Sequence, residues 1–129
     1  MARMEIHDLG GALLDAWVAR AQGLADIRVT HRGSATPLCM ARWVDRTEVV
    51  PYSPSTDWAL ANLIIDREHI ALRDLWIQDR PPAFEAMLRR ADVTWFARGE
   101  LPLVAAMRVY VRSRFTEEEV RQRSFGFGA

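Results

Sequence analysis

Asp57 and Trp58 close the polar segment Tyr52–Trp58, where hydroxyl and carboxylate side chains are concentrated. The side chains of Ser55, Thr56 and Asp57 could line a polar pocket roofed by the indole of Trp58. The same composition is typical of a helix start, because such oxygens accept hydrogen bonds from the free backbone N–H groups of the first turn. We favour the helix start, with Trp58 packed in the core behind it.

Histidine beside carboxylates could supply a general base or a metal ligand, and the chain has three histidines. Asp66 and His69 are three residues apart on an expected helix, so their side chains could converge. Neighbouring Glu68 would point elsewhere. No cluster has the ligand spacing of a metal site, and we predict no metal and no cofactor. A pocket near Asp57, Trp58 and His69 remains the alternative, as the site of a small-molecule-binding domain or a modest hydrolase.

Cys39 is the only cysteine, which rules out an intramolecular disulfide. It lies in the apolar run Leu38–Val44, and we predict a small buried side chain. A nucleophilic thiol would need a nearby base such as His31. All 17 basic residues are arginine, so neither a Schiff-base lysine nor a phosphate-loop lysine is possible.

Arginine also recurs on the expected last helix, where Arg108 and Arg112 are four residues apart and Arg114 is close by. Such a row could bind phosphates or the acidic face of a partner. The acidic run Glu117–Glu119 would offset its charge, and the core should occupy the wide apolar face of this helix. We favour a solvated helix edge, which leaves nucleic-acid binding as the weakest hypothesis.

Five tryptophans are many for 129 residues, and we expect most of them in the core. Tryptophan and arginine are also enriched among residues that dominate protein interfaces. An exposed patch of the two residue types would therefore indicate a partner surface. We expect such a patch at Trp76, Trp95 and Arg98, because edge strands can present one.

The composition indicates one globular domain spanning residues 1–129, with half of the residues hydrophobic and a formal net charge of zero. This charge gives no global attraction to nucleic acid or to anionic membranes. No apolar run is long enough to span a bilayer, and no secretory signal is recognisable. We therefore predict a cytoplasmic protein.

The apolar periodicity predicts helices and strands in alternation. The predicted helices are Leu9–Ala21, Asp57–Glu68 and Pro102–Phe115, and the predicted strands are Asp26–His31, Leu38–Val44, Ile70–Ile77 and Val93–Ala97, with a short extended piece at Glu48–Val50. Asp8 should cap the first helix and Gly23 should end it, with Asp15 and Arg20 facing solvent. The last helix should be the most buried element.

The remaining segments are the connections between these elements and the C-terminal residues. Local propensity favours a short helix at Pro81–Arg90, while Arg32–Ser34 reads as a turn. Thr116 and Glu119 match a capping box, and Ser124–Ala129 should be a flexible tail. The order of elements predicts an α+β fold, a small antiparallel sheet with about three helices packed on one face.

Three blocks of the sequence resemble the NinX-like family of small phage and prophage proteins, a domain of unknown function. They are Gly11–Ala21 with Gly23, Tyr52–Trp58 continuing through Ile64–Glu68, and Leu101–Met107 continuing through Arg108, Val111 and Phe115. Leu101-Pro102 stands where the family has Thr-Pro, and Leu60–Asn62 replaces a glycine-rich stretch. The resemblance implies a strand or an irregular connection at 81–90 and a bacterial host. It implies no activity and no catalytic residues.

The sequence predicts a non-enzymatic accessory protein that binds an unknown protein partner or itself, without membrane contact. The absence of a phosphate loop and of a Gly-x-Ser-x-Gly nucleophile motif favours this interpretation. The candidate binding residues are Asp57, Trp58, Trp76, Trp95, Arg98, Arg108 and Arg112, and no residue is predicted to be catalytic.

Overall fold

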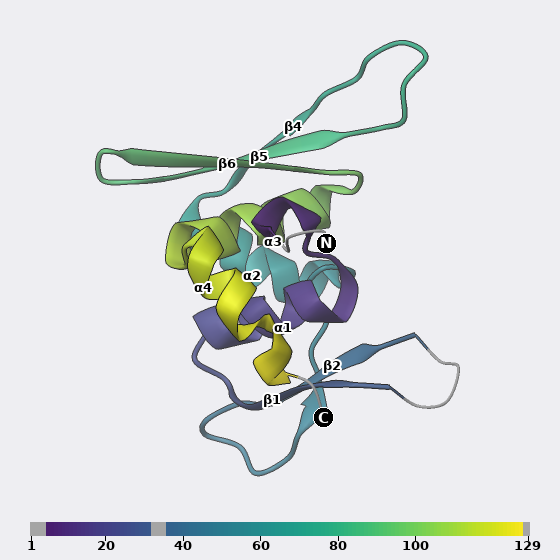
Figure 1. Cartoon of the computed structure of the whole chain (residues 1–129). Helices are drawn as coiled ribbons and strands as arrows, with labels where there is room; N and C mark the ends of the chain where they lie inside the picture. Colours follow the sequence, from purple (N-terminus) through teal and green to yellow (C-terminus); the bar gives the residue numbers. More distant parts are fainter. Residues whose placement is uncertain (1–4, 32–35, 128–129) are drawn as a thin grey trace.

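The helices of this protein lie between two small sheets (Figure 1). The computed structural model describes residues 5–31 and 36–127. The elements are, in chain order, η1 (Ile6–Asp8), α1 (Gly11–Ala21), β1 (Ala25–Thr30), β2 (Leu38–Arg42), β3 (Val50–Pro51), α2 (Trp58–Glu68), β4 (Ala71–Asp74), β5 (Phe84–Arg90), β6 (Val93–Gly99), α3 (Pro102–Arg114), α4 (Glu117–Arg123) and η2 (Ser124–Phe127). None of the described helices is long and apolar enough to cross a bilayer.

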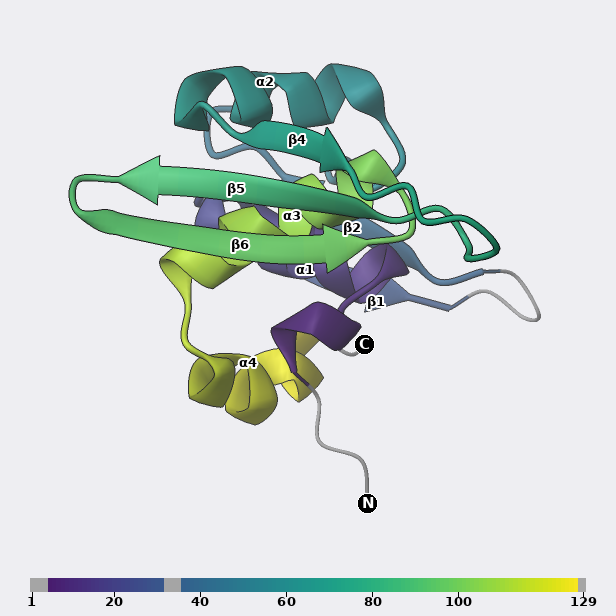
Figure 2. The same cartoon turned by 90° about the horizontal axis from the view of Figure 1, so that it is seen from above.

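Both sheets are antiparallel, in the orders β1-β2-β3 and β4-β5-β6. The predicted α+β class is confirmed, but the strands form two sheets where the sequence suggested one. The reason is local, because each strand pairs with its neighbour in the chain and α2 separates the two sets. Helix α1 packs against the first sheet and α3 against the second, and the two helices contact each other. Seen from above, β4–β6 covers the helices, and no other described element lies on its outer face (Figure 2).

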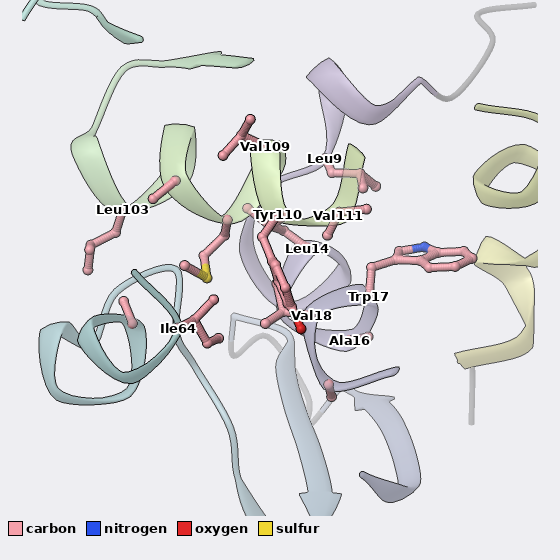
Figure 3. Packing of buried hydrophobic residues seen from close by; sticks show 14 of the residues in the cluster. Leu9, Leu14, Ala16, Trp17, Val18, Ile64, Leu103, Val109, Tyr110 and Val111 are labelled. Carbon is pink, nitrogen blue, oxygen red and sulfur yellow. The ribbon is translucent and has the colours of Figure 1, made fainter. Parts of the chain in front are cut away.

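Side chains of α1, α2 and α3 meet in a single apolar core (Figure 3). Trp17 of α1 is fully buried, and its ring packs edge-on against Phe115 and Phe127. Helix α3 buries seven residues, and so does the shorter α1. The prediction that α3 is the most buried element is therefore wrong. The expectation that most tryptophans are core residues is also wrong. Of the five tryptophans only Trp17 is fully buried, and Trp95 is half-buried against the core.

Helix α1 does not begin at the predicted cap, Asp8. Residues Ile6–Asp8 form η1, and Gly10 is the N-cap of α1. Leu9 is fully buried between η1 and α1, and Gly11 takes a φ of +53°, a left-handed value that favours glycine. Gly23 ends α1 as predicted, with a φ of +76° and an N–H that donates to the carbonyl of Arg20.

The segment 81–90 is not the helix that local propensity favoured. It contains β5, the central strand of the second sheet, as the family resemblance allowed. Ala86 and Leu88 face the core, while Met87 and Arg89 are exposed. Pairing on both sides and burial of one face outweigh the helix propensity of these residues. The predicted strand Ile70–Ile77 is shorter and corresponds to β4.

The chain continues beyond α3 into packed structure. The capping box is confirmed, because the Thr116 hydroxyl accepts from the N–H of Glu119 and the Glu119 carboxylate accepts from the N–H of Thr116. The predicted flexible tail is wrong for Ser124–Phe127, which forms η2. Phe127 is buried against Trp17, and the Ser124 hydroxyl accepts from the Trp17 indole at 3.1 Å. Residues 128–129 and the turn at Arg32–Ser34 lie outside the described residues. The single-domain assignment stays a prediction.

Candidate functional site

Asp57 starts α2, as the helix-start hypothesis requires. Its carboxylate accepts a hydrogen bond from the N–H of Ala59 at 2.9 Å, and its backbone is extended. Pro54 lies before the helix and outside its first turn. Trp58 is not a core residue, because half of its surface is exposed. The first position of α2 points outward, since the helix buries only Ala61 and Ile64.

Ser55, in the same segment, binds a buried carboxylate of α1. The Ser55 N–H donates to Asp15 at 2.8 Å, and both residues are almost completely buried. The prediction that Asp15 faces solvent is therefore wrong. Burial raises the pKa of the Asp15 carboxyl to about 6, and the hydrogen bond from the Ser55 backbone N–H opposes this only in part. The Ser55 hydroxyl forms no hydrogen bond with the described residues.

The alternative pocket near Asp57, Trp58 and His69 would require side chains from both ends of α2 to converge. Asp57 is the N-cap and His69 the C-cap of α2, which places them at opposite ends of an 11-residue helix. A helix of this length separates its ends by about 16 Å, so the two side chains cannot line one small pocket. Two larger hollows lie elsewhere, about 710 Å³ along the loop 43–50 and about 440 Å³ near the start of α1.

The arginines of α3 bind backbone and carboxylate groups of the protein itself. Arg108 donates to the carbonyl of Leu9 at 2.7 Å and to that of Arg98 at 2.8 Å. Arg112 donates to the carbonyl of Phe96 at 2.6 Å. These bonds join α3 to Leu9 and to β6, so Arg108 and Arg112, both candidate binding residues, form hydrogen bonds within the fold.

Arg114 belongs to a separate cluster around Glu68. The Glu68 carboxylate accepts from Arg67 at 3.0 Å, from Arg90 at 2.6 Å and from Arg114 at 3.3 Å. Burial by itself would raise the pKa of Glu68, but the bonds to these arginines outweigh it and lower the pKa. Arg114 therefore joins α3 to α2 and β5 and does not extend a row with Arg108 and Arg112.

The cysteine and histidine positions show no reaction centre among the described residues. Cys39 is buried as predicted, and burial raises the pKa of its thiol to about 12, which keeps it protonated and unreactive. His31 is exposed. One group of possible metal ligands occurs in the described part of the chain, formed by Glu5, His7 and Asp8. The two ring nitrogens of His7 lie 3.1 and 3.3 Å from carboxylate oxygens of Glu5 and Asp8, so the three side chains form a polar group at the surface.

The outer face of the second sheet carries an exposed apolar row. The register places Ala71, Met87 and Phe96 side by side on β4, β5 and β6. Met87 is 37% exposed and Phe96 49%. A shallow hollow of about 230 Å³ lies along this row and is lined on one side by Arg73 and Glu85. We call this surface, formed by Ala71, Arg73, Glu85, Met87, Arg89, Thr94, Phe96 and Arg98, the outer face.

Charge on the outer face is dominated by arginine. Arg73 donates to Glu85 at 2.6 Å and Arg98 donates to the same carboxylate at 3.4 Å. Arg89 lies on the other side of the apolar row. Three arginines and one glutamate therefore give this surface a formal charge of +2, on a chain whose net charge is zero.

The predicted patch of Trp76, Trp95 and Arg98 is only partly assembled. Arg98 is on the outer face, but Trp95 is half-buried on the opposite face, with the Arg90 guanidinium 5.8 Å from its ring centre. Trp76 is 75% exposed in the loop between β4 and β5. Met87 and Phe96 are not among the predicted site residues. For Met87 the alternation Glu85, Met87, Arg89 was the available signal, and the helix predicted at 81–90 concealed it. Phe96 lies in the predicted strand Val93–Ala97.

These features define a small α+β protein with an exposed apolar and basic sheet face and no assembled catalytic group in its described part. Residues 5–114 match the model of a protein family described as Bacteriophage P22, NinX. The chain belongs to this phage family. A search of curated proteins gave no match.

Proposed function

We propose that this protein is a non-enzymatic accessory protein of the phage or its integrated prophage. It acts in the cytoplasm of the bacterial host by binding a protein partner, or a second copy of itself, through the outer face. The exposed row of Ala71, Met87 and Phe96 between arginines carries this proposal. Apolar side chains bordered by arginine resemble the centre and rim of a protein interface more than a solvated sheet surface.

The distribution of the other polar groups supports the same function. Asp15, Asp57, Arg108 and Arg112 satisfy backbone groups, so they are occupied in the folded protein. The outer face is different, because its exposed side chains have no comparable role in folding. A binding role also explains why an uncovered sheet keeps Met87 and Phe96 at positions where polar residues would be stable.

Affinity capture from a bacterial host lysate, followed by mass spectrometry, tests the proposal. The double variant Met87→Ser, Phe96→Ser should lose the captured partner while keeping its thermal unfolding temperature within a few degrees, because both side chains are exposed. Leu63→Ser is the matched control, since Leu63 is 66% exposed on α2, away from the outer face. Sedimentation of the wild type at several concentrations separates self-association from a different partner.

Two results would contradict the proposal. The first is capture of the same proteins by the wild type and the double variant. The second is the absence of any captured protein together with a monomer at all concentrations.

A further inference from the structure

The two edge strands of the sheet β4–β6 differ in whether their outward backbone groups form hydrogen bonds. On the β6 edge, the carbonyls of Phe96 and Arg98 point away from β5 and accept hydrogen bonds from Arg112 and Arg108 of α3. Side chains of α3 therefore occupy the acceptors that an added strand would need. Covering an edge in this way prevents pairing with other chains.

The β4 edge has no such cover in the described part of the chain. The N–H of Leu75 donates to the carbonyl of Ala83, and Arg73 lies opposite Glu85 in the same register. This alternation directs the backbone groups of Arg73 toward β5 and those of Leu72 and Asp74 outward. None of the described residues forms a hydrogen bond with these outward groups. A free row of donors and acceptors is the template that strand addition uses.

Side chains around the β4 edge indicate the chemistry of the strand that would fit. Leu72 lies opposite buried Ala86 and is still 36% exposed on the inner side of the edge. The Arg73 side chain is 68% exposed on the outer side. Helix α2 runs beyond the β4 edge, on the side away from β5 (Figure 2). An added strand would thus place alternate side chains over Leu72 and α2, and the others beside Arg73.

We propose that the β4 edge binds an extended acidic segment of a partner protein and adds it to the sheet as a fourth strand. The inference rests on the proposed function, and it specifies the binding mode and the partner class. Apolar side chains of the segment cover Leu72, and its carboxylates face Arg73 and the +2 charge of the outer face. The short edge of Ala71–Asp74 suits one peptide strand.

A second copy of this chain fits the same edge less well. Antiparallel pairing of two β4 strands with Leu72 opposite Asp74 places the two Arg73 side chains directly opposite each other on the outer face. Like charges in that position are destabilising. The alternative register, with Leu72 opposite Leu72, places each Arg73 opposite Ala71, but both registers bring two outer faces of charge +2 side by side in one sheet. We therefore assign the edge to a different, acidic chain.

The test uses a synthetic, end-capped peptide of alternating glutamate and valine, about seven residues long, a typical strand length. Titration into isotopically labelled full-length protein should shift the amide signals of Leu72 and Asp74 and slow their hydrogen exchange. A peptide with lysine in place of glutamate should bind at least about tenfold more weakly. So should the acidic peptide with alternate backbone nitrogens methylated, because it cannot donate to the edge.

Matched proline variants locate the edge. Asp74→Pro removes an outward N–H from β4 without removing a bond to β5, and should weaken binding of the acidic peptide about tenfold. Thr94→Pro removes an outward N–H from β6, and should leave the affinity within about twofold. Arg73→Gln should weaken binding of the acidic peptide and make its affinity less dependent on salt concentration.

The outcomes separate this inference from the proposed function. Equal loss of binding in both proline variants, or equal binding of the methylated peptide, would overturn strand addition. The same holds if the acidic peptide shifts no β4 amide. A wild-type dimer in sedimentation that Asp74→Pro abolishes would show strand addition by a second copy, and would overturn the assignment of the edge to an acidic partner. Partner capture that depends on Met87 and Phe96 but not on Asp74 would sustain the proposed function and reject the edge. Capture independent of all three residues would reject the proposed function itself.

Discussion

The segment Tyr52–Trp58 and the outer face differ in what their polar and apolar groups do. In the segment, Asp57 caps α2 and Ser55 binds the buried Asp15, so its polar groups maintain the fold. On the outer face, Met87 and Phe96 are exposed, and Arg73 and Arg98 bind the Glu85 carboxylate on the same face. The segment that identifies the family is therefore structural, and the surface that could bind a partner lies in the part of the sequence with the weakest signal.

The comparison teaches that a family motif can identify a fold without identifying a site. Helix starts and buried hydrogen bonds constrain residue type strongly, because an unpaired buried group is costly. A solvent-exposed sheet face constrains it much less. Substitutions in the two regions should therefore have separable effects, on stability in one region and on binding in the other.

The largest expected effect concerns Asp15. The pKa of Asp15 is raised from 3.8 to about 6 in the folded protein, so the folded state binds this proton more tightly than the unfolded state. Proton binding therefore stabilises the fold fully below about pH 4, and this stabilisation is lost as the pH rises through 6. The lost contribution approaches about 3 kcal/mol. Asp15→Asn removes this dependence. Relative to the wild type, the variant should gain stability between pH 4 and 8, as measured by urea unfolding at each pH.

Asp66→Asn is the control for this experiment, because Asp66 is exposed on α2. Parallel stability profiles for the wild type and Asp15→Asn would show that Asp15 is not buried as described. The contrast between the structural segment and the outer face would then lose its main support.

Arg108→Ala should lower the free energy of unfolding by about 2 kcal/mol. The variant loses two hydrogen bonds from a charged donor, to the carbonyls of Leu9 and Arg98. Chemical unfolding should show this loss. Arg89→Ala, on the outer face, should change the free energy of unfolding by less than about 0.5 kcal/mol. If the two variants were equally stable, the division of arginines into structural and surface groups would be wrong.

A smaller effect, about 1 to 2 kcal/mol, is expected for Gly99→Ala at the end of β6. An added Cβ would lie 2.8 Å from the backbone nitrogen of Ala105 and 3.0 Å from a methyl carbon of Val104, so β6 and α3 would have to separate. Differential scanning calorimetry should show a lower unfolding temperature. Gly126→Ala, with no atom within 4 Å of the added Cβ, is the control and should unfold as the wild type does.

Much of the fold could be predicted from the sequence where the signals are local. The apolar stripe of α1, the cap at Asp57, the capping box at Thr116 and the short strands β1 and β2 each depend on neighbouring residues. The candidate site could not be predicted as well. Trp76, Trp95 and Arg98 were proposed as one patch, but opposite faces of a strand separate Trp95 from Arg98, and Met87 was hidden in a segment assigned to a helix.

The sequence by itself determined the α+β class, the family, the starts of α2 and α4, and the burial of Cys39, because periodicity and capping chemistry act within a few residues. Tertiary structure alone decided that the strands form two sheets, that β5 is a central strand, that Asp15 is buried and that Arg108 and Arg112 close one sheet edge. These outcomes depend on contacts between residues up to about a hundred positions apart in the chain, such as that of Arg108 with Leu9. Local propensity does not encode such contacts; the free energy of burying one face of each element selects them.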